Sequence, residues 1–252
     1  MTGAGNTSIS GVVGNGAGGL TKSGAGSLTL SNTNTYTGTT NISAGTLVLS
    51  GGNGTTAGTL ATTTGGGVVN NATLQLQANA TNTSGGISTA LTGTGTSSQI
   101  LTTSGTSSTI QLRGDSNVTF FASSSTNGFL GGVNNVSGYT LNFDVDQLTG
   151  AGSNNTFTFG STTNGLQIGR NVQVNVTGGN GDSLVIGPVS YVSTTGILTL
   201  NPTTANLTMG GFKNNQTSAA TLTLGGTSSG NIVDGAIANL SLIHISEPTR
   251  PR

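Results

Sequence analysis

The chain has 252 residues, of which 44 are glycine and 5% are charged, and its formal net charge is zero. This composition excludes a mainly helical fold, because glycine, threonine, serine and asparagine are poor helix formers. The neutral balance leaves no basic surface that could bind nucleic acid. Because the chain has no cysteine, its fold cannot depend on disulfide bonds.

The first regular pattern consists of two pairs of leucines. The segment from Ser8 to Gly19 predicts a short strand followed by a glycine turn. Beyond it, apolar residues alternate with polar ones at Leu28 and Leu30, and again at Leu47 and Leu49. A two-residue apolar period predicts a half-buried β-strand. Because the pattern returns nineteen residues later, successive strands can stack in a β-solenoid, with turn threonines and asparagines hydrogen-bonded between coils.

Residues 17–50 contain one copy of a longer motif, formed by Gly19, Leu20, Lys22, Gly24, Gly26, Leu28, Leu30, Tyr36, Gly38, Thr40, Gly45, Leu47 and Leu49. This pattern closely resembles the autotransporter-associated β-strand repeat, found in secreted and cell-surface passenger regions of bacteria. The resemblance implies an all-β fold, a right-handed parallel β-helix (β-solenoid), exported to the exterior of the bacterial outer membrane. It implies no particular reaction. The sequence predicts no catalytic, cofactor-binding or metal-binding residue.

After Ser50 the pattern loosens and then returns. Thr73–Gln77 is a good alternating strand, and only residues 99–101 stand out before Ser108. From there, strands are predicted at intervals of roughly ten residues, at Ile110–Leu112, Val118–Phe121, Leu141–Val145, Phe157–Phe159, Leu166–Ile168, Val172–Val176, Leu184–Ile186, Ile197–Leu200, Leu207–Met209 and Leu222–Leu224. Even spacing suits a solenoid or a sandwich, and the repeat favours the solenoid. Ten coils would form a rod about 50 Å long.

The composition changes sharply at Leu240. The terminal segment, LSLIHISEPTRPR, holds the only histidine and the only glutamate of the chain. It resembles a widely used transposase sequencing adapter translated in frame. We therefore expect residues 1–239 to be a β-helical passenger fragment and residues 240–252 to be a non-native, disordered tail. No apolar run has the length of a transmembrane helix, and no signal peptide follows Met1, so the export signal and membrane anchor are expected outside this fragment.

Asp144 and Asp146 form the one close carboxylate pair. In the predicted strand, Leu141, Phe143 and Val145 point inward, which places both aspartates on the outer face. Carboxylates two residues apart on a strand lie about 7 Å apart, near the lower end of the range for inverting glycosidases. A carbohydrate-active β-helix enzyme, a polysaccharide hydrolase or lyase, is therefore the alternative function. A solvated outer face is the simpler interpretation, since residues 1–239 contain no glutamate or histidine for acid–base catalysis.

Two short motifs have simpler interpretations as turns. Residues 178–184 resemble a calcium-binding nonapeptide repeat, but Asp182 comes one position early and no second copy follows. Arg113, Gly114 and Asp115 form the tripeptide that some integrins recognise, and the strand before them predicts only a turn.

The predicted function is therefore that of a non-enzymatic passenger module, a structural scaffold or an adhesin at the cell surface or secreted. Its predicted partners are glycans or surface proteins of a host or the environment, the remainder of its own passenger, and a membrane anchor.

Overall fold

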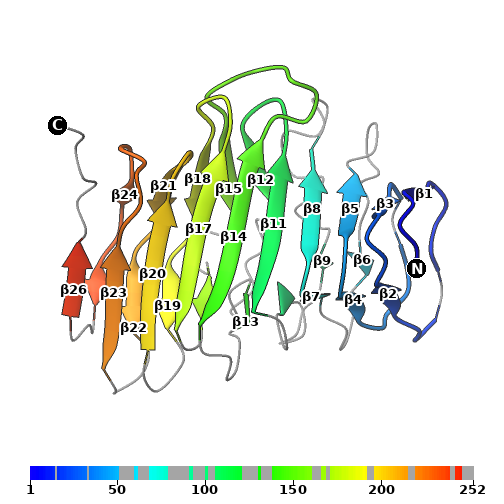
Figure 1. The fold of residues 1–252 in the computed structure, drawn as a ribbon, viewed down its shortest axis with the longest axis horizontal. Coiled ribbons are helices and arrows are strands. Elements are labelled where there is room, and N and C mark those ends of the chain that lie inside the picture. The colour runs from blue at the N-terminus through cyan, green and yellow to red at the C-terminus, as the bar shows by residue number, and fades with distance from the viewer. Residues whose placement is uncertain are drawn as a thin grey trace.

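The computed structural model describes residues 1–14, 16–32, 34–50, 60–61, 68–78, 91–92, 100–101, 106–120, 130–131, 138–160, 166–168, 171–191, 196–214, 219–238 and 242–245. These residues form β-strands joined by turns, and strands follow one another along an elongated rod with β1 at one end and β26 at the other (Figure 1). In the described part of the chain there is no helix long and apolar enough to cross a membrane.

One long sheet runs the whole length of the rod. It has ten strands, and each pairs in parallel with the next. In spatial order they are β1 (Thr7–Ile9), β3 (Ser27–Leu30), β5 (Thr46–Ser50), β8 (Thr73–Gln77), β11 (Ser107–Arg113), β14 (Tyr139–Asp146), β17 (Val172–Gly178), β20 (Gly196–Pro202), β23 (Ala220–Leu224) and β26 (Leu242–Ile245).

Shorter sheets complete the wall of the rod. One contains β2 (Leu20–Lys22), β4 (Thr40–Ile42), β7 (Val68–Asn70), β10 (Ile100–Leu101) and β13 (Leu130–Gly131), and another contains β16 (Gln167–Ile168), β19 (Val189–Tyr191), β22 (Phe212–Asn214) and β25 (Ile237–Ala238). Because β13 contacts β16, the second continues the first. A third sheet contains β12 (Val118–Phe120), β15 (Thr156–Phe159), β18 (Ser183–Ile186), β21 (Asn206–Met209) and β24 (Ile232–Val233), and a pair is formed by β6 (Leu60–Ala61) and β9 (Leu91–Thr92).

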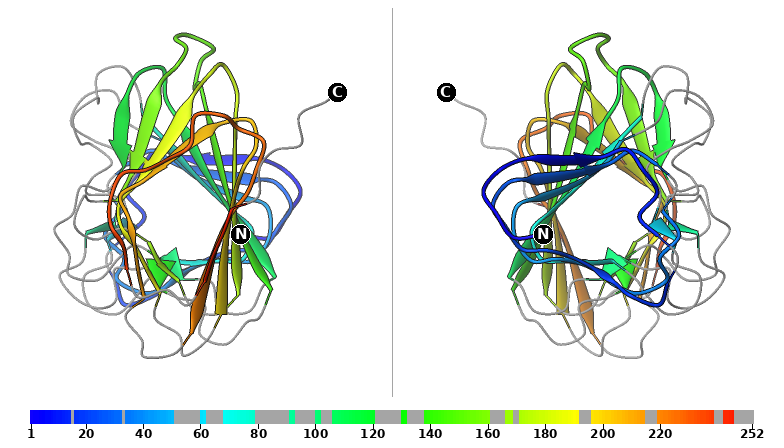
Figure 2. Two further views of the ribbon diagram at one scale, coloured as in Figure 1. Left: turned by 90° about the vertical axis from the view of Figure 1, so that its left-hand side faces the viewer. Right: turned by 90° about the vertical axis from the view of Figure 1, so that its right-hand side faces the viewer.

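The core is a column of apolar side chains stacked in register. Leu28 pairs with Leu47, Leu47 with Leu74, and Leu74 with Ile110. All four side chains are fully buried. The alternation of buried and half-buried residues along β14 shows why: every second side chain enters the column. The views along the rod show the strands winding round its long axis (Figure 2).

The molecule is the β-solenoid that the leucine pattern predicted, with the parallel strands that the family resemblance implied. Its connections are right-handed, as they are for nearly all parallel strands joined by a crossover.

The coils differ in length along the rod. Leu28 pairs with Leu47, nineteen residues later, whereas Phe143 pairs with Val176, thirty-three residues later. The strands predicted at ten-residue intervals therefore lie mostly in different sheets of the same coil. The long coils contain additional strands, such as β15 between β14 and β17, which the short first coils lack.

The predicted strands from Thr73–Gln77 onward are confirmed within the described residues, as β8, β11, β12, β14, β15, β16, β17, β18, β20, β21 and β23. Phe121, the last residue predicted for β12, lies outside them. Four residues of the terminal segment, Leu242–Ile245, form β26 and pair with β23. The other residues of 240–252 lie outside the described part, and the non-native origin of this segment remains a prediction.

Candidate functional site

The repeat glycines lie where the backbones of successive coils touch. A Cβ atom on Gly24 would be 2.0 Å from the carbonyl oxygen of Gly3, and one on Gly26 would be 2.2 Å from that of Gly5. Cβ atoms do not approach carbonyl oxygens so closely, so only glycine fits at either position. The Gly-x-Gly of the repeat therefore stacks on the Gly-x-Gly of the coil before it.

Lys22 joins two coils from a buried position. Lys22 lies on β2 and is 2% exposed. Its ammonium group donates one hydrogen bond to the carbonyl oxygen of Gly24 and another, at 3.2 Å, to that of Ala44. Gly45 closes the same contact, because a Cβ atom there would lie 2.6 Å from the lysine Nζ. The repeat lysine thus holds together the turn of its own coil and the turn of the next.

Tyr36 and Thr40 of the repeat form a second buried contact. Their hydroxyl oxygens are 2.8 Å apart, and both residues are buried. Burial raises the pKa of Tyr36 to about 12, although the hydrogen bond to Thr40 opposes the rise. This contact lies within one coil, between β3 and β5, and its role is structural.

Asp144 lies on the outer face of β14, as the alternation predicted. It forms an ion pair with Arg113 on β11, and Gln111 donates to the same carboxylate at 3.1 Å. Gln75 extends this row to β8, since its amide donates to Gln111 at 2.9 Å. The carboxylate of Asp144 is thus part of a polar row that crosses three strands.

Asp146, also on the outer face, fixes the turn of the next coil. Its Oδ1 accepts hydrogen bonds from the backbone N–H of Gln147 at 2.8 Å and from the side chain of Asn180 at 2.9 Å. Asn180 lies in the turn between β17 and β18. Asp144 therefore contacts the coil before β14, and Asp146 contacts the coil after it. These contacts favour a non-catalytic outer face over a catalytic carboxylate pair.

Arg113 and Asp115 of the integrin-type tripeptide are also engaged within the rod. Asp115 accepts hydrogen bonds from the backbone N–H groups of Leu148 and Thr149, at 3.0 and 2.9 Å, and from the Thr149 hydroxyl at 2.7 Å. Burial raises the pKa of Asp115, but these hydrogen bonds outweigh it and hold the pKa below its usual value. The predicted turn is confirmed, and its charged groups link β11 to the turn after β14.

Asp182, in the calcium-like motif, is a buried residue of a tight turn. Asn180 and Gly181 have φ angles of 54° and 77°, and the Asp182 N–H donates to Gly179 at 2.9 Å. The predicted turn before β18 is therefore confirmed. Asp182 is 1% exposed, and its Oδ1 accepts from the backbone N–H of Asn155 at 2.7 Å. Its Oδ2 is buried without a hydrogen-bond partner.

Ionisation of Asp182 costs the folded state free energy. Burial raises its pKa, the Asn155 backbone N–H lowers it, the Asp146 carboxylate raises it, and the Asn155 side chain lowers it, with a net rise above the usual value. The resulting loss of stability is absent below the unfolded-state pKa of about 3.9, grows as pH rises above that value, and is complete once pH exceeds the raised folded-state pKa.

We expect Asp182→Asn to raise the midpoint of thermal unfolding at pH 7, because asparagine keeps the acceptor for Asn155 without the charge. The gain should disappear in acid, where Asp182 is protonated in both states. Melting curves of both proteins between pH 3 and 8, followed by circular dichroism, measure this. Asp234→Asn, in a different turn, is the control. An Asp182→Asn protein that melts lower at every pH contradicts the prediction.

Asparagine side chains replace strand hydrogen bonds at the turns. Four asparagine side-chain oxygens accept hydrogen bonds from backbone N–H groups of a neighbouring coil, at 2.8 to 3.0 Å. The accepting asparagine and the donating residue are Asn6 and Ser27, Asn117 and Thr156, Asn171 and Ile197, and Asn231 and Leu207. On the long sheet, Asn201 donates to Asn175 and Asn175 to Asn142, each at 2.8 Å. The predicted bonding of turn asparagines between coils is confirmed. The outer-face ladder was not predicted, although the asparagines occupy paired positions of successive strands.

Comparison with known families identifies the repeat. Residues 20–49 match the Passenger-associated-transport-repeat family. The predicted resemblance of this stretch to an autotransporter passenger repeat is thereby confirmed. The match covers the lysine contact and the tyrosine–threonine contact described above. No curated protein and no solved structure matches the chain. Within the described residues, no three histidine, cysteine, aspartate or glutamate side chains gather in a way that could hold a metal ion.

Proposed function

We propose that this chain is a non-catalytic structural spacer in the passenger region of an autotransporter-like protein. The passenger-associated transport repeat at residues 20–49 indicates an autotransporter passenger, and passengers are surface-exposed or secreted. The partner implied by the repeat is the membrane anchor domain of such a protein. The rod would hold neighbouring parts of the passenger away from the cell.

The observation that carries this proposal is the use of charged side chains between coils. Arg113 pairs with Asp144 of the next coil, Asp115 binds the turn at Thr149, and Asp146 binds Asn180. A general acid or base needs a carboxyl group that is free to exchange a proton with substrate. Groups that are held by neighbouring coils are better suited to stiffening a rod.

A broad polysaccharide panel tests the enzyme alternative directly. The purified protein is incubated with neutral and acidic polysaccharides, and new reducing ends and unsaturated products are measured. The expected result is no product above the rate with heat-denatured protein. Product formation that is lost in Asp144→Asn, and kept in the control Asp234→Asn, would replace the spacer with a glycan-active enzyme.

A binding screen separates a spacer from an adhesin. We expect the folded rod to show no saturable binding to arrays of host and environmental glycans or to extracellular-matrix proteins. Saturable binding that persists at physiological salt and is lost on thermal unfolding would make the rod an adhesin instead.

A further inference from the structure

The turn between β17 and β18 is built on an asparagine–glycine pair. Asn180 and Gly181 have φ angles of 54° and 77°, and the carbonyl oxygen of Gly179 accepts the N–H of Asp182 at 2.9 Å. Positive φ at both central positions defines a type I′ turn, for which Asn-Gly is a preferred pair. Glycine is also required by space, because a Cβ on Gly181 would lie 2.4 Å from the side-chain oxygen of Asn154. The fold therefore selects this pair.

The same pair is chemically reactive. The backbone nitrogen of the residue after an asparagine can attack the side-chain carbonyl carbon, and glycine hinders this attack least because it has no Cβ. Asn180 and Gly181 are both exposed, so water reaches the reacting atoms. The chain contains five Asn-Gly pairs, and this is the one whose two residues the structure describes.

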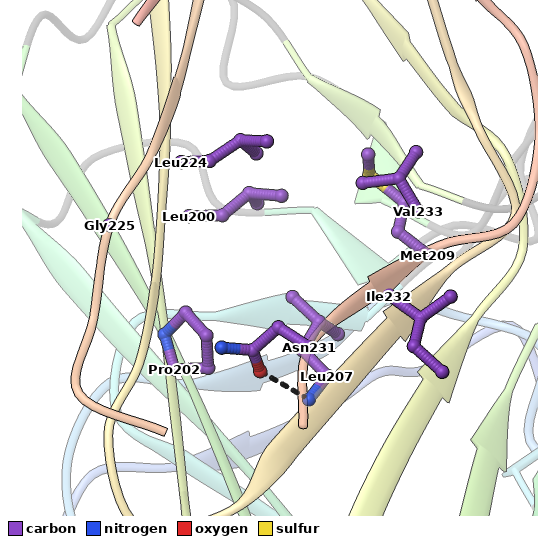
Figure 3. A pocket seen from close by; sticks show the side chains of 9 residues that line it. All are labelled: Leu200, Pro202, Leu207, Met209, Leu224, Gly225, Asn231, Ile232 and Val233. Atoms are coloured by element: carbon purple, nitrogen blue, oxygen red, sulfur yellow. Dashed lines mark hydrogen bonds between the residues drawn. The ribbon is translucent and has the colours of Figure 1, made fainter. Parts of the chain in front are cut away.

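Asn180 is bound to the neighbouring coil in a different way from the asparagines that accept backbone N–H groups. Asn231 shows the bond that those residues make: its side-chain oxygen accepts the N–H of Leu207 at 3.0 Å, beside an apolar hollow of about 80 Å³ (Figure 3). An aspartate would keep that bond between coils. The side-chain nitrogen of Asn180 instead donates to the Asp146 carboxylate at 2.9 Å, and an aspartate at position 180 would lose this donor.

Asp146 holds the Asn180 side chain against the preceding coil. Its carboxylate lies over Gly179, where a Cβ atom would be 2.9 Å from Oδ1. The same Oδ1 accepts the N–H of Gln147 at 2.8 Å, which fixes the carboxylate at the end of β14. Cyclisation brings the Asn180 side chain onto the Gly181 nitrogen, so the side chain must first leave Asp146.

We propose that Asn180 is a site of spontaneous deamidation, which its hydrogen bond to Asp146 slows. The Gly181 nitrogen forms a bond to Cγ of Asn180 and gives up its proton, while the Cγ–Nδ2 bond breaks and Nδ2 leaves as ammonia. Water then opens the resulting succinimide to aspartate or isoaspartate. A second carboxylate replaces the donor to Asp146, so the contact between two coils becomes repulsive. The rod therefore contains a point at which it weakens irreversibly with age.

Peptide mass spectrometry of aged protein tests the modification. Wild-type protein is kept in mildly alkaline buffer at 37 °C and digested with trypsin, beside a fresh sample that gives the background. The tryptic fragment between Arg170 and Lys213 contains Asn180 together with Asn171 and Asn175, each of which is followed by valine. We expect conversion at Asn180 while the other two remain amides. Conversion no faster at Asn180 than at these two would overturn the proposal.

Asp146→Ala tests the role of the carboxylate. Conversion at Asn180 should become roughly three- to tenfold faster, as expected for the loss of one hydrogen bond. Asp144→Ala is the matched control and should react at the wild-type rate, because Asp144 lies on the same face of β14 but pairs with Arg113 of the preceding coil. Circular dichroism checks that both variants fold.

If Asp146→Ala does not fold, Asp146→Asn makes the comparison. It reduces a charge-assisted hydrogen bond to a neutral one, and a smaller acceleration is expected. A folded Asp146 variant that reacts no faster than the wild type would show that this hydrogen bond does not slow the reaction.

Asn180→Asp tests the consequence of the modification. Its thermal midpoint at neutral pH should be lower than that of the wild type, because its carboxylate faces Asp146. Asn117→Asp is the control, since the oxygen that accepts the N–H of Thr156 is kept, and it should melt close to the wild type. Equal midpoints for Asn180→Asp and the wild type would contradict the weakening of the rod.

Discussion

Gly45→Ala is expected to lower the free energy of unfolding by roughly 2–5 kcal/mol, because the new methyl group has no space and the wrong backbone conformation. Gly45 has a φ of 68°, and its Cβ would lie 2.4 Å from the carbonyl oxygens of both Gly24 and Gly26. The left-handed conformation costs a non-glycine residue about 1–2 kcal/mol. Overpacking adds about 1–3 kcal/mol, and here the contacting atoms are backbone atoms, which cannot rotate away.

Urea denaturation followed by circular dichroism measures this effect. Gly18→Ala is the matched control, because a Cβ on Gly18 meets nothing within 4 Å, and its effect should stay within about 0.5 kcal/mol. Gly45→Ala should also shift the amide signals of Lys22 and Ala44, whose contact it crowds. Equal denaturation midpoints for the two variants would show that the coils are not packed as closely as the structure has them.

The parallel β-helix could be predicted because its cause is local. Leu28, Leu30, Leu47 and Leu49 show both the strand period and the return of the pattern within twenty-two residues of sequence. The predicted strands of the second half also occur where apolar residues alternate. In each case, the residues that reveal the strand are the residues that fill the core.

Some short strands away from the long sheet could not be predicted in this way. β6 and β13 have two residues each, which is too short for any alternation to be recognised. Their position is decided by pairing with the neighbouring coil. The variable coil length hides such pairs as well, because Leu28 meets its partner after nineteen residues and Phe143 after thirty-three.

The roles of the charged residues also depend on pairing between coils. The alternation along β14 correctly predicted that Asp144 and Asp146 face outward. It could not predict the ion pair with Arg113, which is thirty-one residues away in sequence, because that distance is one coil whose length was unknown. Gly24 and Gly26 were recognised because they match the family pattern. Their contacts with Gly3 and Gly5 could not be predicted, because they depend on how successive coils are aligned.

Leu28→Ala and Leu30→Ala should each lower the free energy of unfolding by about 2–5 kcal/mol, the usual cost of a buried leucine with the cavity it leaves. Both side chains are fully buried, and each lies between a neighbour on β1 and one on β5. Ile197→Ala removes an apolar group of the same size from an exposed position of β20, and its effect should stay within about 0.5 kcal/mol. Urea denaturation of the three variants makes the comparison.

Substitutions of stacked leucines should also interact with one another. Leu28 and Leu47 are direct neighbours, so the double variant Leu28→Ala, Leu47→Ala should depart from the sum of the single effects, by about 0.5–3 kcal/mol for contacting residues. Leu28 and Leu222 lie far apart along the rod, so their effects should add. Because coils contact only their neighbours, hydrogen exchange should accelerate in β1, β3 and β5 first. Uniform acceleration along the whole long sheet would mean that the rod unfolds as one cooperative unit, and the local column would then not explain its stability.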